Sequence, residues 1–555
     1  MQIDWPFVRS QSAIENLKSL IQSDFVEKLS ARPGPLLRWL PIVILAIPSI
    51  WMLISVPPLW RDVDGYNQVT LPPGPMTILQ FSSLYCFSAR IPLYAGCAWD
   101  SFFAHAPIPG WEFFSHPTLT DHGVFFLVAL QHLLLLSAQA FLLRAISPTF
   151  FVQIPLALLL ALNSTFYVFA HSVGAEAVAL SSSLFLAGWV IRIFAARAVP
   201  RRAWIWFGVS LTICILLRHI NAVLAALLPV SYLVNGGAQT VRALFRRGTA
   251  GFPRRLVRRE LLRACLAVVI AFLCLGVAFR TVRFIARAAH IHYRSAMGPI
   301  FLWRLNFLAR MEPNQRAAFL NRLASRTDDP VLKRMLLETP SAISKEGQWD
   351  AGACTQHLLR ILEDSGVREG VGYQFDQYLN RLAKIFLLSF ERPFLGAVWN
   401  DFLEAGRISL REVATFPIAT TQYCFGRIDE MPQLKGLTTF KSDGAEHVLV
   451  RQQQNKYYRW VDFRLTQALA GWVVLGGLCC IFLRGSRRRI VGLSATLVCV
   501  GLALLLLNCL FTELLPRFLL PAWILLFAAA LLNLGYLLET LCKELFGLQA
   551  GRVQK

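Results

Sequence analysis

The chain has 555 residues, of which 55% are hydrophobic and 16% are charged. Its mean hydropathy is +0.50, and its 55 Lys and Arg against 33 Asp and Glu give a net charge of +22. These values exclude an ordinary water-soluble domain, and they exclude disordered, collagen-like and disulfide-scaffold proteins as well.

Apolar runs of about 20 residues recur along most of the chain, and this is the length needed to cross a bilayer. The sequence therefore predicts an all-α polytopic membrane protein with about ten transmembrane helices. The predicted spans are residues 40–58, 122–145, 149–168, 172–194, 203–217, 220–235, 263–281, 466–484, 490–511 and 516–538.

The positive charges lie in short connections between these runs. Eight arginines from Arg242 to Arg263 are opposed by Glu260 alone, and the other arginines of this kind are Arg201, Arg202, Arg484 and Arg487 to Arg489. A strongly basic chain can indicate a nucleic-acid partner, but arginines between apolar runs mark the cytoplasmic side of a membrane protein. We therefore expect a plasma-membrane protein with both termini in the cytoplasm, surrounded by membrane lipids and without a nucleic-acid partner.

The two ends of the chain are expected to be a cytoplasmic N-terminal segment of residues 1–39 and a cytoplasmic tail of residues 539–555. No small-residue cleavage site follows the first apolar run, so we expect the first span to stay in the protein. Apolar residues recur at helical intervals from Ile14 to Leu29. This spacing fits an amphipathic helix on the inner membrane surface, and an irregular tail is an equal alternative.

Two connections on the outer side are long, residues 59–121 after the first span and residues 282–465 after the seventh. The first has an apolar aromatic stretch at 76–99, which predicts helices lying along the membrane surface. The second is charged and has the pattern of a mainly helical domain. Function is expected in such loops, while residues 40–281 and 466–538 hold the transmembrane helices.

Twelve cysteines are present, and four of them map to the outer loops, in an oxidising compartment. Pairing within each loop predicts a disulfide between Cys354 and Cys424 in the large loop. Cys86 and Cys97 form a second candidate pair in the first loop. No zinc-binding spacing occurs among the cysteines. Three histidines of the first loop also lack a recognised metal-site spacing: His105, His116 and His122.

Ionisable residues collect at the outer ends of the predicted spans. A charge at membrane depth is costly unless it is paired or hydrated, so such residues are candidates for function. They form four groups: Asp62 and Asp64 after the first span, His171 and Glu176 at the start of the fourth, Arg218 and His219 between the fifth and sixth, and Glu513 and Arg517 between the ninth and tenth.

Structural interpretations stand beside the functional one. Asp62 next to Arg61 fits a hydrated boundary residue, and Arg61 would hold it charged and weakly basic, which favours Asp64 as a proton acceptor. Arg218 and Arg517 fit arginines whose head groups extend to the membrane interface. A carboxylate within an otherwise apolar helix, such as that of the fourth span, favours a functional role.

Short motifs surround these groups. They are Asp64-Gly65-Tyr66, Ala170-His171-Ser172 with Glu176-Ala177, Leu216-Leu217-Arg218 and Leu515-Pro516-Arg517-Phe518. In this order they resemble the GT-C superfamily of membrane glycosyltransferases, which includes protein O-mannosyltransferases and the lipid A aminoarabinose transferase. Members of that family have a seven-span module, matched here by residues 40–281, with long outer loops after spans one and seven.

The resemblance implies a glycosyltransferase that takes a sugar from a polyprenyl-phosphate donor. The sugar would pass, with inversion, to a hydroxyl of a glycan, lipid or protein acceptor on the outer face. Arg218 and Arg517 would bind the donor phosphate, and Asp64 would accept the proton of the acceptor. Asp62 and Glu176 are the other candidate catalytic acids. The supporting residues would be Tyr66, His171, His219 and Glu513.

The chain departs from the family pattern at two positions. Many members have an adjacent Asp-Glu pair where this chain has Asp64-Gly65, and Phe518 replaces a tyrosine. Which acid is catalytic, and whether a divalent cation is bound, therefore stay open.

Two other functions are alternatives. A transporter or lipid flippase would place its charges near the bilayer midplane within repeated elements. A non-catalytic scaffold would bind a partner through residues 282–465. The sequence has no internal repeat, and its charged groups map to one face of the membrane, which favours the enzyme.

Overall fold

The structure, a computed structural model, describes residues 37–196, 198–245, 254–366, 370–441, 443–455, 462–483 and 489–546. Helices make up most of this part of the chain. Two short strands, β1 (Leu59–Trp60) and β2 (Ser172–Val173), pair in parallel. The amphipathic helix predicted between residues 14 and 29 lies outside the described residues, as does the end of the C-terminal tail.

Eight helices of the described chain are long and apolar enough to cross a membrane. They are α3 (Leu40–Ser55, preceded by η2, Leu37–Trp39), α7 (Asp121–Ile146), α10 (Ala175–Ala195), η5 (His219–Ala226) with α12 (Leu227–Phe245), α13 (Arg254–Ala288), α23 (Leu465–Phe482), α24 (Arg489–Phe511) and η12 (Pro516–Leu519) with α25 (Leu520–Phe546). The prediction of an all-α polytopic membrane protein is thereby confirmed. The other two predicted spans correspond to α11 (Arg201–Leu217), which has 17 residues, and to a bent helix pair, so a total of ten spans stays a prediction.

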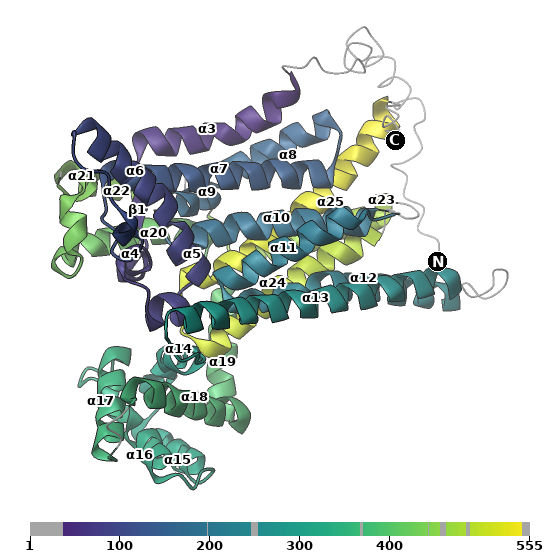
Figure 1. The fold of residues 1–555 in the computed structure, drawn as a ribbon. Coiled ribbons are helices and arrows are strands. Elements are labelled where there is room, and N and C mark those ends of the chain that lie inside the picture. Colours follow the sequence, from purple (N-terminus) through teal and green to yellow (C-terminus); the bar gives the residue numbers. More distant parts are fainter. Residues whose placement is uncertain are drawn as a thin grey trace.

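Helix α10 lies at the centre of the bundle. Most of its side chains are buried, and the hydroxyls of Ser181 and Ser183 donate to carbonyls within the helix, at 3.3 and 2.8 Å. Figure 1 shows α10 between α7 and α11, with α3 at one edge of the bundle and α13 at the other. Helices at the edges expose large apolar side chains such as Ile47, Phe272 and Val474, which suits contact with lipid.

Two breaks in helices bring short loops to the same end of the bundle. Helix α8 (Phe150–Leu162) stops at Asn163, and α9 (Ser164–Ala170) leaves it at an angle of 61°. Because of this bend, α9 delivers β2 beside β1. Arg218 is extended (φ −153°, ψ 117°) between α11 and η5, which confirms the predicted split near residue 218. The bend at Asn163 was not predicted.

The first loop is helical, as predicted, and packs on α7. Its elements are α4 (Asp62–Thr70), η3 (Met76–Gln80), α5 (Ser83–Ser88), α6 (Arg90–Phe103) and η4 (Trp111–Phe114). Helix α6 crosses α7 so closely that a Cβ added to Gly96 would lie 2.2 Å from the backbone nitrogen of Gly123. The opposite side of α6 exposes Trp99 and Phe102, as expected of a helix on a membrane surface.

The second loop is also mainly helical, as predicted, and it divides into two parts. Residues 297–405, called the lobe below, contain α14 (Met297–Arg304), η6 (Leu305–Arg310), α15 (Pro313–Ala324), α16 (Pro330–Glu338), η7 (Thr339–Ala342), α17 (Ala351–Asp364), α18 (Val371–Ser389) and α19 (Arg392–Ala405). The second part contains α20 (Leu410–Gly426), η8 (Ile428–Glu430), η9 (Pro432–Gly436), α21 (Thr438–Lys441) and α22 (Asp443–Gln454). Figure 1 shows the lobe beside the ends of α13 and α24, while α20 to α22 turn back towards α4 and α6.

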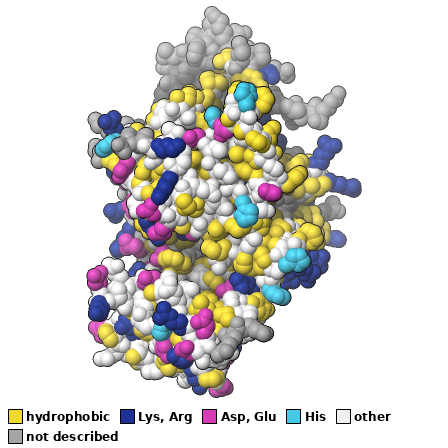
Figure 2. Space-filling view, turned by 60° about the vertical axis from the view of Figure 1, so that its left-hand side comes forward, with side chains coloured by type: hydrophobic (Ala, Val, Ile, Leu, Met, Phe, Trp, Pro, Cys, Tyr) yellow, Lys and Arg dark blue, Asp and Glu magenta, His cyan; other side chains and the backbone are white. Residues whose placement is uncertain are grey.

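A buried ion pair within the lobe joins the two lobe helices that pack on the bundle. Arg304 is fully buried in α14 and donates to Asp401 in α19, and both of these helices pack on α24. Figure 2 shows acidic and basic side chains mixed over the surface of the lobe, at the bottom of that view. The lobe therefore has the surface of a water-exposed domain on a membrane bundle.

The predicted disulfide between Cys354 and Cys424 is wrong, because both residues are free thiols in the structure. Cys354 packs in the lobe within α17, whereas Cys424 lies in α20 and belongs to the same apolar cluster as Met431 and Trp60 of the first loop. The prediction treated the second loop as one unit, but each cysteine fills an apolar position in a different part of it. The candidate pair in the first loop, Cys86 and Cys97, is free as well.

We expect Cys354 and Cys424 to remain free in protein purified without reductant. Burial raises the pKa of each thiol to about 12, so neither is a reactive thiolate at neutral pH. Alkylation after denaturation should label both residues completely in a mass-spectrometric peptide map. A sample reduced before alkylation is the control and should give the same map. A cross-linked peptide pair seen only without reduction would contradict the structure.

Candidate functional site

Strand β1 positions the start of α4 at the end of the bundle. The Trp60 N–H donates to Thr421 Oγ1 of α20 at 2.7 Å, so β1 is held by β2 on one edge and by α20 on the other. A Cβ on Gly65 would lie 2.5 Å from the carbonyl oxygen of Val173. Only glycine lets α4 begin this close to β2.

Arg61 is the most tightly held charge at this place. Its Nη1 donates to Glu176 Oε1 and its Nη2 to Asp64 Oδ2, both at 2.6 Å. Burial acts to lower the pKa of Arg61, but the carboxylates of Glu176, Asp64 and Asp62 raise it above its usual value. Arg61 is therefore a permanent charge that ties α4 to the start of α10.

Asp62 begins α4 in the left-handed region of the backbone, with φ 45°. This conformation is strained for a residue other than glycine, and the side chain compensates in part, because Oδ1 accepts the Asp64 N–H at 2.8 Å. Its Oδ2 lies 3.6 Å from Arg517 Nη1. Burial raises the pKa of Asp62 and outweighs the opposing charges of Arg61 and Arg517. Asp62 is thus a stronger base than an ordinary aspartate.

Asp64 is the most accessible carboxylate. Its side chain is 39% exposed, compared with 26% for Asp62 and 3% for Glu176. Its Oδ2 also lies 3.6 Å from Arg517 Nη2. The expectation that Arg61 pairs with Asp62 was wrong, because Arg61 bonds directly to Asp64. Accessibility, rather than freedom from Arg61, is what favours Asp64.

Glu176 is enclosed in the first turn of α10, where the positive end of the helix dipole favours a carboxylate. Its Oε1 accepts from Arg61 and lies 3.5 Å from Arg218 Nη2. Its Oε2 has no hydrogen-bond partner among the described residues. A carboxylate that is closed to solvent and shared by two arginines suits a positioning role better than proton transfer.

Arg218 and Arg517 lie at the two predicted turns and face the carboxylates. Their side chains are 18% and 12% exposed, and their ion contacts of 3.5 to 3.6 Å are longer than those of Arg61. Two nitrogens of Arg517, Nε and Nη1, make no hydrogen bond within the described chain. These guanidinium groups therefore retain donors for an anionic ligand.

Six side chains form what we call the charged cluster: Arg61, Asp62, Asp64, Glu176, Arg218 and Arg517. Their three positive and three negative formal charges cancel. They come from four separate segments that meet where α3, α9, α11 and α24 end. Arg201 and Arg489 begin α11 and α24, so they lie at the opposite ends of these helices from the charged cluster.

The four predicted supporting residues lie outside the charged cluster. Tyr66 is buried in the apolar core of the first loop. His171 is buried too, and its Nε2 donates to the Val56 carbonyl at 2.9 Å while its Nδ1 lies 3.0 Å from His132 Nε2. This hydrogen-bonded chain fixes α9 against α3 and α7. His171 is thus a structural residue.

The other two supporting residues are also apart from the carboxylates. His219 is exposed and faces the Phe279 ring at a centroid distance of 6.3 Å. Glu513 is partly buried, which raises its pKa, and its neighbouring charges are Arg517 and Arg310 of the lobe.

A second layer of residues was missed by sequence reasoning. The hydroxyl of Tyr85 accepts the Gly174 N–H at 2.9 Å and donates to Gln131 Oε1 at 3.2 Å. Gln131 Nε2 in turn donates to the carbonyls of Ala170 and Ser172. These bonds hold the backbone on both sides of β2. The sequence signal that could have indicated this layer was Gln131, a polar side chain inside the apolar run 122–145.

Metal binding has no preformed site in the described chain. No group of three His, Cys, Asp or Glu side chains there is arranged to hold an ion. The three carboxylates of the charged cluster each face a guanidinium group instead. His122 contacts Asp100, so this histidine has a protein partner.

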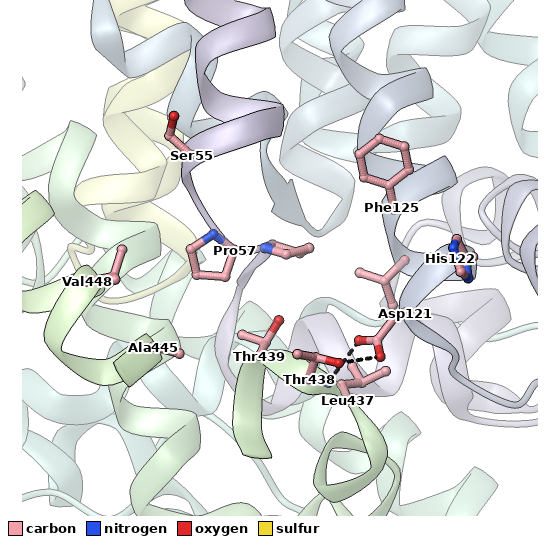
Figure 3. A pocket seen from close by; sticks show the side chains of 12 residues that line it. Ser55, Pro57, Asp121, His122, Phe125, Leu437, Thr438, Thr439, Ala445 and Val448 are labelled. Carbon is pink, nitrogen blue, oxygen red and sulfur yellow. Dashed lines mark hydrogen bonds between the residues drawn. The ribbon is translucent and has the colours of Figure 1, made fainter. Parts of the chain in front are cut away.

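A cavity of about 660 Å³ lies at the ends of α3 and α7, beside the prolines that precede β1. Figure 3 shows Pro57, Asp121 and Phe125 around it, with Asp121 accepting two hydrogen bonds from Thr438. None of its lining residues belongs to the charged cluster, and none is Lys or Arg. It therefore lacks the permanent positive charge that the charged cluster offers to an anion.

The charged cluster combines an accessible carboxylate, a second carboxylate of raised pKa and two incompletely bonded arginines. Such a set can accept a proton from a hydroxyl and stabilise negative charge that develops on a phosphate. No family model, curated protein or solved structure matches the chain.

Proposed function

We propose that the protein is a membrane glycosyltransferase that moves a sugar from a polyprenyl-phosphate donor to an acceptor hydroxyl on the outer face, with inversion. The observation that carries this proposal is the charged cluster, in which carboxylates and arginines from four distant segments converge at one end of the bundle. The acceptor would be a glycan, a lipid or a protein. The apolar donor chain would lie among the spans, and its phosphate at the membrane interface.

Arg218 and Arg517 are the proposed ligands of the donor phosphate. A guanidinium group matches two phosphate oxygens at once, and these two arginines are less tightly bonded than Arg61. The charged cluster is neutral without substrate. A bound donor with a single negative charge therefore gives the site a net charge of only −1. The departing lipid phosphate gains a second charge, which the arginines are placed to stabilise.

Asp64 is the proposed proton acceptor. As the acceptor oxygen forms its bond to the anomeric carbon, its proton passes to the Asp64 carboxylate. The bond between the anomeric carbon and the phosphate oxygen breaks, and its electron pair leaves with the lipid phosphate. Attack on the face opposite the phosphate inverts the anomeric configuration. Glu176 and Arg61 would hold the cluster in place during this step.

Mass analysis of envelope glycans and lipids, from cells with and without the gene, tests this function directly. We expect one species to lose the mass of a sugar when the gene is removed, and Asp64→Ala protein at normal abundance should not restore it. Restoration by that variant would favour a transporter, a flippase or a scaffold. Against transport stands the position of the charges, which lie at one end of the bundle rather than along its middle.

The orientation in the membrane gives a separate prediction. In a variant without native cysteines, Glu346→Cys in the lobe should react with an impermeant thiol reagent in intact cells. Arg258→Cys at the opposite end should stay unlabelled until the membrane is opened. Both positions are exposed in the structure, so a shielded thiol reports the cytoplasmic side. The reverse labelling pattern would place the charged cluster inside the cell, where this donor would not be required.

A further inference from the structure

Phe518 lies beside both of the arginines assigned to the donor phosphate. The guanidinium carbon of Arg517 is 5.0 Å from the centroid of the Phe518 ring, and that of Arg218 is 5.5 Å from it. Phe518 is 9% exposed and lies in η12, just before α25 begins. One buried ring thus contacts two guanidinium groups, which come from two different turns between helices.

The Phe518 ring offsets the repulsion between the two arginines. Two guanidinium groups close together repel each other, and the nearest carboxylates to Arg218 and Arg517 are 3.5 and 3.6 Å away, too far for strong hydrogen bonds. The negative face of an aromatic ring attracts a cation within about 6 Å of its centroid. Phe518 meets this distance for both arginines without consuming any of their N–H donors.

We infer that Phe518 is a positioning residue, which holds Arg218 and Arg517 together as one clamp for a single phosphoryl group. This inference rests on the proposed function, since it assumes that the two arginines bind the donor phosphate. A carboxylate in the place of Phe518 would hold the arginines as well, but it would occupy their donors and repel the phosphate. An aromatic ring aligns them and leaves the donors available.

A phosphate-binding measurement on the purified full-length protein tests this inference without any sugar transfer. The probe is farnesyl phosphate, and farnesol serves as the matched probe that lacks the phosphate. We expect Phe518→Leu to bind farnesyl phosphate with a Kd about 2- to 30-fold higher, the effect of losing a cation–π contact worth about 0.5–2 kcal/mol. Farnesol binding should not change. Phe518→Tyr keeps the ring and should bind as the wild type does.

Phe416 provides a matched control. Its ring is 6.0 Å from Arg517, and no contact with Arg218 accompanies it in the described chain. Phe416→Leu should therefore raise the Kd for farnesyl phosphate less than Phe518→Leu does. Equal Kd values for Phe518→Leu and the wild type would overturn the inference. Equal losses of farnesol and farnesyl phosphate binding would overturn it too, because they would show a general packing role.

Two further variants separate this inference from the proposed function. If Arg218→Ala and Arg517→Ala bind farnesyl phosphate as tightly as the wild type, the proposed donor site fails and the clamp fails with it. If both arginine variants lose binding while Phe518→Leu retains it, only the clamp fails. Inorganic phosphate alone should bind much more weakly than farnesyl phosphate if the ligand is a lipid phosphate. Should Phe518→Leu not fold, Phe518→Met gives the same loss of ring with a more adaptable side chain.

Discussion

Asp64→Asn should lower sugar transfer by about 10²–10⁴-fold if proton acceptance is its main contribution. The substitution keeps the size of the side chain and removes the base. Because Asp64 is the most exposed carboxylate of the charged cluster, the variant should fold and accumulate normally. Binding of farnesyl phosphate should change much less than turnover, since the phosphate contacts are assigned to Arg218 and Arg517. Initial rates with a polyprenyl-phosphate sugar in detergent measure the effect.

Asp62→Asn is the informative comparison. Burial raises the pKa of Asp62, which makes it the stronger base, but its oxygens face the Asp64 N–H and Arg517. We expect a smaller loss of turnover than for Asp64→Asn. An inactive Asp62→Asn variant together with an active Asp64→Asn variant would identify Asp62, rather than Asp64, as the proton acceptor. Asp429→Asn lies at a highly exposed position of η8 and should leave turnover unchanged. It controls for effects of mutagenesis and purification on the measured rate.

Arg61→Gln should be strongly destabilising. It removes both 2.6 Å ion contacts and leaves Glu176, which is 3% exposed, with Arg218 at 3.5 Å as its remaining ion contact. Removing one partner of a buried ion pair typically costs about 3–5 kcal/mol. We expect the free energy of unfolding to fall by this amount. The variant should accumulate to a lower level in cells and aggregate at a lower temperature in detergent.

The double variant Arg61→Gln with Glu176→Gln identifies the cause. It removes both charges of the buried pair, so most of the lost stability should return, although transfer should remain impaired. Arg407→Gln is a matched surface control, because its pair with Glu404 is exposed and such pairs contribute about 0–1 kcal/mol. A single Arg61→Gln variant as stable as Arg407→Gln would show that this ion pair does not hold α4 to α10.

Much of the fold could be predicted because lipid imposes a simple rule on length. An apolar run of about 20 residues has few alternatives to a helix in a membrane, so α3, α7, α10, α13 and α24 lie near their predicted positions. The bend at Asn163 could not be predicted in this way, because the run remains apolar across it. The return of α20 to Trp60 depends on a hydrogen bond between residues more than 300 positions apart, and no local pattern carries that information.

The charged cluster could be predicted in part. The cost of an unpaired charge in lipid drew attention to Glu176, Arg218 and Arg517, and the structure brings all three to Asp62 and Asp64. Which side chains pair depended on backbone geometry that the sequence does not reveal. Asp62 has a positive φ. Its side chain faces Arg517 rather than the adjacent Arg61, which bonds to Asp64 instead. His171 and Tyr66 carry functional groups of the right kind but point into the core.

The order in which the charged cluster is made has a consequence for biogenesis. Arg61, Asp62, Asp64 and Glu176 emerge first and carry a net charge of −2, which Arg218 reduces to −1. Neutrality waits for Arg517, which follows roughly 15–60 s later at ordinary rates of synthesis. Until then the first half of the protein holds uncompensated acid at the edge of the membrane. A chain that stops before the final span would keep one uncompensated negative charge in the charged cluster, which we expect to destabilise the packing of α4 and α10.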